Sequence, residues 1–261
     1  MSFVYKEVGG LGFYEVSGWE GATGLFTTRK GGVSRPPFDS LNLGAGSGDD
    51  PALVARNRAL LANAIGIAPG AIRTVSQVHE SDVYTLCDPE APRPEKSYDA
   101  VVSNVPGAAL AILTADCAPI LLYDPVSRAA ASVHAGWAGT VKEVAASAVR
   151  RMTEVFGAAP RDIKAAIGPS IGPCCYEVGE KVMTPLRDEH SDWREFTETV
   201  SPGHWYLDLW EANRHVLLSA GLKSENIAVM GLCTMCNPDK FYSHRGSGGK
   251  AGRMMGIALL G

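Results

Sequence analysis

Four stretches of the chain carry apolar residues at the spacing of an amphipathic helix. The first begins at Asp50-Pro51, where the aspartate can cap a helix and the proline suits its first turn, and it runs up to Gly66. Glycine, a common helix terminator, also follows the second and fourth stretches. The other predicted helices are Thr140–Phe156, Glu177–Arg187 and Asp208–Ala220.

Short apolar runs between these helices predict β-strands. Several lack clean alternation of apolar and polar residues, which is typical of strands covered on both faces. Helices and strands follow one another in mixed order, and this favours a layered α/β or α+β fold with mixed sheets and flanking helices. The predicted strands are Arg73–Val78, Ala100–Ser103, Ala109–Leu113, Ile120–Tyr123, Ala130–Val133, Ala165–Ile167, Ile227–Met230 and Met255–Leu260.

One proline-rich stretch, Asp88–Lys96, interrupts this pattern. Three prolines in nine residues disfavour regular structure, so we interpret it as an exposed loop and not as a boundary between domains. The sequence has no internal repeat or low-complexity segment. We therefore expect a single domain over residues 1–261, and a monomer is the default expectation.

Composition and charge narrow the class of protein. Hydrophobic residues make up 46% and charged residues 20%, the balance of a globular protein with a core. The net charge is -4 and basic residues are not clustered, which argues against nucleic acid or an anionic membrane as partner but allows a small anionic ligand. The start of the chain does not resemble a targeting signal and no apolar run is long enough to span a membrane, so we expect a cytoplasmic protein.

Three candidate metal ligands, His79, Cys117 and His134, each follow a predicted strand. Polar residues at the ends of buried strands often carry function. Two imidazoles and one thiolate suit zinc, and three protein ligands leave one coordination position for water or substrate. Their spacing matches no compact zinc-finger pattern, so the residues alone leave two interpretations open: a shared metal centre, or separate hydrogen-bonded structural roles.

Six cysteines are too few for a disulfide scaffold in a chain of this length. Cys233 and Cys236 have the spacing of a redox or zinc-knuckle pair. The adjacent Cys174 and Cys175 could in principle complete a four-cysteine site with them. We prefer the interpretation that these four are buried thiols.

The segments around the candidate ligands, Thr114–Pro125 and Val133–Thr140, resemble the laccase-domain family. This is the YfiH-like group, long labelled multicopper polyphenol oxidases and more recently purine nucleoside phosphorylases. The resemblance extends in order over nearly the whole chain. Further matching segments are Phe26–Ser34, Ser40–Gly44, Gln77–His79, Ile167–Gly179, Leu207–Asn213, Phe241–Arg245 and Gly252–Arg253.

The resemblance implies a fold of the YfiH-like cysteine hydrolase type and a metal bound by His79, Cys117 and His134, the positions that match the family's ligands. Zinc is the expected cofactor, although copper has the higher raw affinity for such ligands. The resemblance also implies phosphate-dependent cleavage of adenosine, inosine or methylthioadenosine. It further implies water-dependent deamination of adenosine.

The matched segments contain candidates for the remaining polar roles. Asp116, beside a metal ligand, could orient that ligand or act as a base, or could cap a turn. Arginines can bind phosphate oxygens in bidentate fashion, and amides can bind ribose or the base. For each of these side chains, ordinary loop, strand-end or helix-surface roles remain the alternative. The candidates for substrate or phosphate are Arg29, Asn42, Arg58, Gln77, Arg245 and Arg253.

Three other functions are alternatives to the predicted cleavage of purine nucleosides. Cys117 and His134 could form a thiolate–imidazole pair that attacks an acyl or amide carbon without a metal. The family resemblance implies editing of cell-wall precursors as the setting for such a reaction. A copper-dependent polyphenol oxidase is disfavoured, because a multicopper enzyme draws most of its ligands from imidazoles and the chain has only six histidines. A metal-stabilised binding protein without catalysis is the third alternative.

Overall fold

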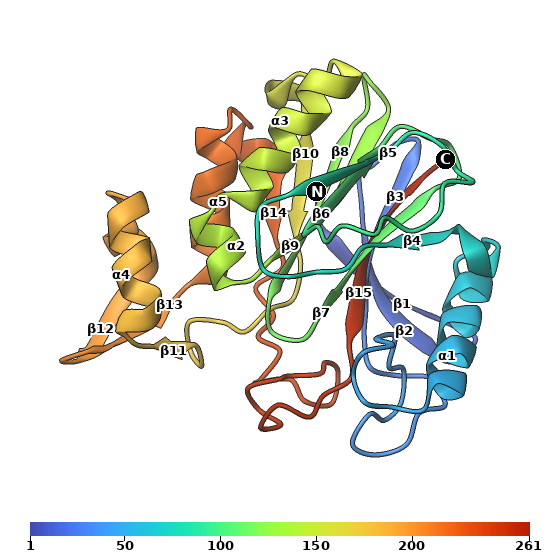
Figure 1. The fold of residues 1–261 in the computed structure, drawn as a ribbon, viewed down its shortest axis with the longest axis horizontal. Helices are drawn as coiled ribbons and strands as arrows, with labels where there is room; N and C mark the ends of the chain where they lie inside the picture. Colours follow the sequence, from blue (N-terminus) through green and yellow to red (C-terminus); the bar gives the residue numbers. More distant parts are fainter.

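Two six-stranded mixed sheets form the centre of the molecule (Figure 1). The computed structural model describes residues 1–261, apart from the side chain of Pro69. The first sheet has the strand order β1 (Phe3–Val8), β2 (Leu11–Val16), β3 (Ala22–Thr27), β15 (Met254–Leu260), β7 (Ala109–Thr114) and β4 (Ile72–Thr74). The second has the order β14 (Ile227–Val229), β10 (Lys164–Ile167), β8 (Ala118–Asp124), β9 (Ala129–Ala135), β6 (Ala100–Ser103) and β5 (Val83–Leu86).

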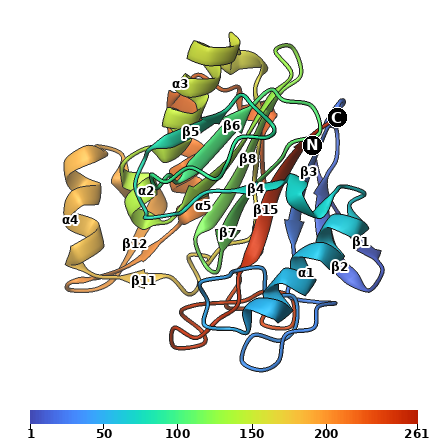
Figure 2. The same cartoon turned by 45° about the vertical axis from the view of Figure 1, so that its right-hand side comes forward.

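Apolar side chains of the two sheets pack against each other, and helices cover their outer faces (Figure 2). Between the sheets, Phe26 and Leu110 of the first meet Val101 and Leu121 of the second. The order of layers is therefore helix, sheet, sheet, helix. Helix α1 (Pro51–Ala64) covers the first sheet, and α2 (Trp137–Val141), α3 (Val144–Phe156) and α5 (Leu209–Ser219) cover the second.

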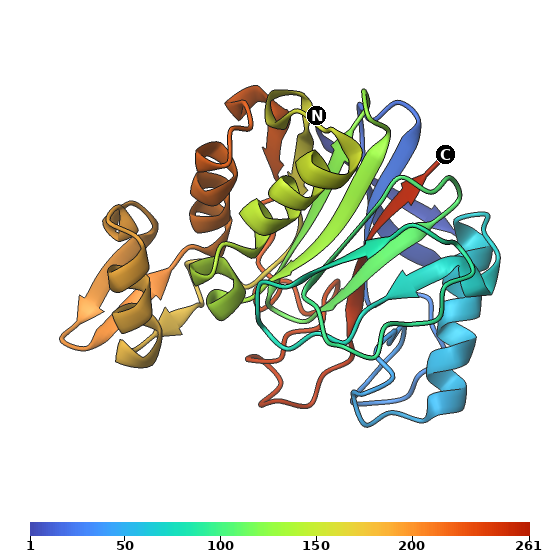
Figure 3. The same cartoon turned by 45° about the horizontal axis from the view of Figure 1, so that its top comes forward.

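A smaller three-stranded antiparallel sheet extends from the edge of the second layer with α4 (Glu180–Glu189), as Figure 3 shows. Its order is β11 (Glu177–Val178), β13 (His204–Leu207) and β12 (Thr197–Ser201). Met183 and Trp205 of this part belong to the same apolar cluster as the helices over the second sheet. Short 3-10 turns complete the chain at Pro69–Ala71, Pro160–Asp162, Trp193–Phe196 and Ser224–Asn226.

The predicted fold class, mixed sheets with flanking helices, is confirmed by these layers. The first and last predicted helices are also correct. Asp50 caps α1 by accepting the N–H of Ala52, and Asp208 caps α5 by accepting those of Trp210 and Glu211.

The prediction of one continuous helix over Thr140–Phe156 is wrong. The chain forms α2 and α3, and Glu143 between them has a left-handed backbone with φ 54°. The predicted helix from Glu177 begins only at Glu180, because Glu177 and Val178 pair with β13. The helical spacing of apolar residues continues through Glu143 and through Glu177–Val178, so the sequence pattern does not show that the helix is interrupted or delayed there.

The predicted strand Arg73–Val78 is also partly wrong, because β4 ends at Thr74 and residues 75–80 continue as a loop. His79 therefore lies in a loop and does not end a strand. Strands β1, β2, β3 and β5 and the third sheet were not predicted. In β1 and β12 nearly all residues are exposed, so neither shows the apolar pattern of a buried strand. Among the residues that the structure describes, every helix is too short or too polar to cross a membrane.

Candidate metal centre and active-site cavity

His79, Cys117 and His134 come together from three separate segments of the chain. His79 lies in the loop after β4, Cys117 in the connection between β7 and β8, and His134 near the end of β9. Strands β8 and β9 pair so that Ala118 is opposite Ala135, which places Cys117 beside the end of β9. One ligand atom from each of the three side chains lies within 4.8 Å of the others, and Cys117 Sγ is 3.9 Å from His79 Nε2.

Asp99 holds both histidines in place. Its Oδ1 accepts hydrogen bonds from His134 Nδ1 at 2.8 Å and from the backbone N–H of His79 at 3.0 Å. Its Oδ2 accepts the backbone N–H groups of Val78 at 3.1 Å and Glu80 at 2.7 Å. A carboxylate that binds the far nitrogen of a histidine fixes the ring and leaves Nε2 for a metal.

This carboxylate also accounts for the backbone of the ligand loop. His79 adopts φ 64°, a left-handed conformation that few residues other than glycine adopt. The three N–H groups bound by the fully buried Asp99 stabilise that conformation. Sequence reasoning missed Asp99. The only available signal was an acidic residue directly before the apolar run Ala100–Ser103.

Gly136 allows the three candidate ligands to approach one another. A Cβ atom at this position would lie 2.9 Å from Cys117 Sγ and 3.0 Å from His79 Cδ2. Any side chain there would push the two ligands apart. The glycine of the His-Ala-Gly-Trp segment is therefore required by the packing of the site.

The electrostatics of the site favour a thiolate. Burial raises the pKa of Cys117, but the charge of His134 and hydrogen bonds from the His134 and His79 rings outweigh burial and lower the pKa to about 6. Burial lowers the pKa of His134, whereas the Cys117 thiolate and the bond to Asp99 raise it to about 9. Cys117 is thus primed to act as a metal ligand or as a nucleophile.

A cavity of about 370 Å³ opens beside the three residues. This is within the size range of small-molecule sites. Of the predicted substrate residues, Gln77 and Arg253 lie in its wall. His244 and Arg93 also line it and were not predicted to do so; the former belongs to the matched segment Phe241–Arg245 and the latter to the proline-rich loop.

The two predicted residues in the wall have part of their hydrogen-bonding capacity occupied. The amide of Gln77 donates to the carbonyl of Leu113 and accepts its N–H, both at 2.8 Å. Arg253 donates to the carbonyls of Ala251 and Gly252 at 2.7 and 3.1 Å through one terminal nitrogen. Burial lowers the pKa of Arg253.

Asn42 and Arg29 brace loops near the cavity. Asn42 is fully buried, its oxygen accepting the N–H of Arg253 at 2.9 Å and its nitrogen donating to Asp49 at 2.9 Å. Arg29 pairs with Asp39 at 3.2 Å and stacks over the Tyr242 ring.

Arg58 and Arg245 likewise bind backbone carbonyls. Arg58, on α1, donates to the carbonyl of Leu43 at 2.9 Å. The Arg245 guanidinium donates to the carbonyl of Glu177 at 3.1 Å and lies over the Tyr176 ring. Their predicted roles with substrate stay predictions.

Asp116 lies next to Cys117 in sequence, but its carboxylate holds the C-terminal loop. Oδ1 accepts the hydroxyl of Thr234 at 2.6 Å, and Oδ2 accepts the backbone N–H of Arg245 at 2.7 Å. These bonds fix the segment that carries His244 into the cavity wall. The carboxylate therefore braces a loop. Its predicted roles, orienting the metal ligand or acting as a base, stay predictions.

Comparison with known proteins shows the family of this chain. Residues 23–261 match the family described as multi-copper polyphenol oxidoreductase laccase. The chain belongs to this family. The resemblance predicted from the sequence is thereby confirmed.

Relatives within the laccase family cover nearly the whole chain. "Purine nucleoside phosphorylase YlmD" of Bacillus subtilis is 38% identical over 237 residues, which are 88% of this chain and 85% of the relative. The crystal structure of Bacillus licheniformis hypothetical protein YfiH matches with a TM-score of 0.93 and 34% identity, over 98% of this chain and 99% of that one. YlmD from Geobacillus stearothermophilus matches with a TM-score of 0.90 and 34% identity, over 98% and 97% of the two chains.

Proposed function

We propose that this chain is a metal-dependent purine nucleoside phosphorylase that acts on adenosine, inosine and methylthioadenosine. The observation that carries the proposal is a cavity whose wall contains two imidazoles and one thiolate together with Arg253 and His244. The name of the Bacillus subtilis relative, purine nucleoside phosphorylase YlmD, supports the same reaction class. In this reaction a phosphate oxygen bonds to the anomeric carbon of the ribose as the bond to the purine nitrogen breaks.

The donor set fits zinc. His79, Cys117 and His134 would hold the ion, since soft thiolate and neutral imidazole are its common ligands and Asp99 supplies the carboxylate that orients His134. A bound zinc ion would supply a Lewis acid able to polarise an oxygen of the substrate or to activate water for deamination of adenosine. Copper could compete for these ligands.

The remaining residues of the cavity would bind and orient the reactants. Arg253 and Arg93 place positive charge in the wall, which suits phosphate. The His244 ring can donate an N–H to the departing purine or to phosphate. Asp116 and Asn42 would act as positioning residues, because they bind the backbone N–H groups of Arg245 and Arg253.

Polyphenol oxidation by a multicopper cluster is disfavoured by the placement of the histidines. His190 binds the carbonyl of Val141, His204 binds Glu177, and His215 lies among acidic side chains. Only His244 is near the three-ligand centre, as part of the same cavity wall. The six histidines therefore do not assemble the ligand sets of a multicopper oxidase.

One specific observation favours a second candidate function, a thiol hydrolase. Cys117, His134 and the buried Asp99 form a chain of interacting side chains of the kind that activates a nucleophilic cysteine. The lowered pKa of Cys117 is in keeping with such activation. Such an enzyme would attack an acyl or amide carbon, as in editing of cell-wall precursors, and would not need a metal. A chelator separates the two, because only the zinc enzyme should lose activity.

The experiment that tests the proposal is incubation of the purified protein with each nucleoside, with and without phosphate. We expect free purine and the sugar 1-phosphate in equal amounts, only when phosphate is present: ribose 1-phosphate from adenosine and inosine, and 5-methylthioribose 1-phosphate from methylthioadenosine. Deamination of adenosine should proceed independently of phosphate. Cys117→Ala should abolish turnover, whereas Cys87→Ser, a change at an exposed cysteine outside the cavity, should not. A zinc-loaded protein that releases no base from any of the three nucleosides would refute the proposal.

A further inference from the structure

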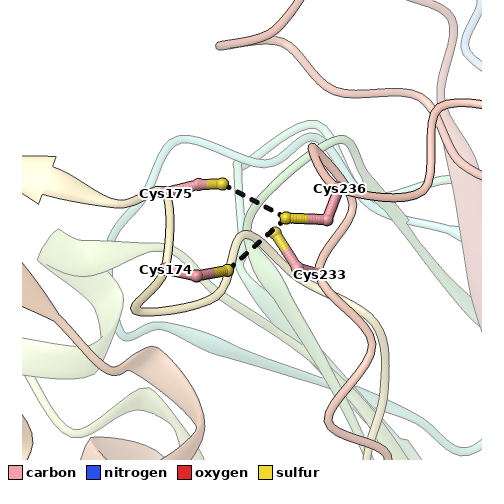
Figure 4. Close-up of side chains that lie close together, drawn as sticks. All are labelled: Cys174, Cys175, Cys233 and Cys236. Atoms are coloured by element: carbon pink, nitrogen blue, oxygen red, sulfur yellow. Dashed lines mark hydrogen bonds between the residues drawn. The ribbon is translucent and has the colours of Figure 1, made fainter.

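A second group of metal-binding side chains lies outside the cavity (Figure 4). Cys174 and Cys175 lie in the turn between β10 and β11, and Cys233 and Cys236 follow β14. One sulfur from each lies within 4.8 Å of the others. We propose that these four thiolates bind a structural zinc ion, distinct from the candidate centre at His79, Cys117 and His134.

The distances between the sulfurs suit a shared ion. Cys236 Sγ is 3.6 Å from Cys174 Sγ and 3.4 Å from Cys175 Sγ. Tetrahedral zinc with Zn–S bonds of about 2.3 Å separates its sulfurs by about 3.8 Å. All six cysteines are free thiols. The preferred sequence interpretation of buried thiols is wrong for three of these four, because only Cys233 is buried.

The local backbone is arranged around the buried sulfur. Cys233 Sγ accepts the N–H of Gly172 at 3.3 Å, a hydrogen bond of the kind that stabilises a coordinated thiolate. Only glycine fits at position 172, because a Cβ atom there would lie 2.7 Å from the Trp210 ring and 3.3 Å from Cys233 Cβ. A β-bridge between Ser170 and Cys233 aligns the two segments.

Four cysteines fill a tetrahedral shell, so the proposed site has no position for substrate and is structural. It would join two segments whose cysteines are up to 62 positions apart. Thr234 follows Cys233 in sequence. Its backbone N–H donates to the carbonyl of Ser170 at 2.9 Å, and its hydroxyl donates to Asp116 at 2.6 Å. The ion would thereby fasten the connection that leads to His244 in the cavity wall.

The test is the zinc content of protein purified under reducing conditions without added metal, compared between four forms of the chain. We expect about two zinc ions per chain in the unmodified protein and about one after Cys236→Ser or Cys117→Ala. The matched control Cys87→Ser should keep about two, because Cys87 lies outside both groups. Cys236→Ser should also unfold at a lower temperature, since a structural ion stabilises the folded state.

The decisive comparison is between the unmodified protein and Cys236→Ser. Loss of about one zinc ion in Cys236→Ser supports the four-cysteine site. If Cys117→Ala has the same zinc content as the unmodified protein, that result counts only against the centre at His79, Cys117 and His134. Equal zinc in the two forms overturns the proposal. If Cys236→Ser does not fold, the test uses the Cys117→Ala protein loaded with cobalt in place of zinc. Thiolate-to-cobalt charge-transfer absorption typical of four thiolate ligands supports the site. Absence of this absorption overturns the proposal.

Discussion

Asp99 is the residue on which the geometry of the candidate centre depends most. It is fully buried, and its two oxygens accept the His134 ring N–H and three successive backbone N–H groups of the loop that carries His79. Burial raises the pKa of Asp99, but the bond from His134 and those from the backbone outweigh it, so the carboxyl is held below its ordinary pKa. A single carboxylate thus positions two of the three candidate ligands.

Asp99→Asn should weaken zinc binding by about 10- to 100-fold, the usual cost of losing an orienting carboxylate. The substitution keeps the size of the side chain but removes the charge and one acceptor. The measurement is competition with a chromogenic chelator, made in the Cys236→Ser background so that the proposed second site does not contribute.

Asp124→Asn provides the control, because Asp124 is equally buried and also binds backbone N–H groups, but at a turn outside the cavity. It should lower stability and leave zinc affinity unchanged. Equal affinities of Asp99→Asn and Asp124→Asn would contradict the role assigned to Asp99.

The reactivity of Cys117 in metal-free protein should depend on pH with a midpoint of about 6. Since the thiolate is the form that reacts, and its fraction rises as pH rises through the pKa, alkylation should be slow below the midpoint and level off above it. Mass spectrometry of peptides alkylated with iodoacetamide gives the rate at this residue.

His134→Ala should move the Cys117 midpoint upward, because it removes the positive charge that favours the thiolate. A midpoint near 8.5, the value of an ordinary thiol, in the unsubstituted metal-free protein would disagree with the geometry described above.

The connection between α2 and α3 is the clearest departure from the sequence prediction at the scale of elements. Alanine-rich periodicity favoured one helix, but Glu143 takes a left-handed conformation between them. The Thr140 hydroxyl accepts a hydrogen bond from the buried Asn213 of α5 at 2.9 Å, which holds α2 against α5. Tertiary packing therefore overrides the local helical preference here.

Glu143→Gly should stabilise the protein by up to about 1 kcal/mol, because glycine adopts a left-handed backbone without the steric cost of a side chain. The same substitution at Glu154, an exposed residue within α3, should destabilise by about 1 kcal/mol. Denaturant unfolding measures both. Destabilisation of similar size at the two positions would show that the Glu143 side chain has a role of its own.

On the scale of the whole molecule, the sequence predicts the class of fold better than its topology. Buried strands such as Ala100–Ser103 are visible as apolar runs. The exposed edge strand β1 and the pairing of β15 with β3 are not visible, since such pairing joins the two ends of the chain and leaves no local pattern. Asp99 was missed for a similar reason, because its partners are distant in sequence.

The candidate ligands themselves could be named from their matching segments, whereas their neighbours needed the folded chain. His79 and His134 come from different loops and strands, and only the fold explains why both turn toward Cys117. The same holds for the side chains predicted to bind substrate. Only the fold shows that Gln77 and Arg253 lie in the cavity wall, whereas Arg29 and Arg58 bind backbone carbonyls of loops.

The central claim is that zinc at His79, Cys117 and His134 supports phosphorolysis of purine nucleosides. Its most direct test is inosine turnover in the presence of phosphate as a function of zinc bound, in protein stripped by a chelator and reloaded in steps. The account predicts turnover that is lost on stripping, returns in proportion to zinc bound at this centre, and stays absent in Cys117→Ala at every zinc concentration. Full turnover by the zinc-free protein would contradict it.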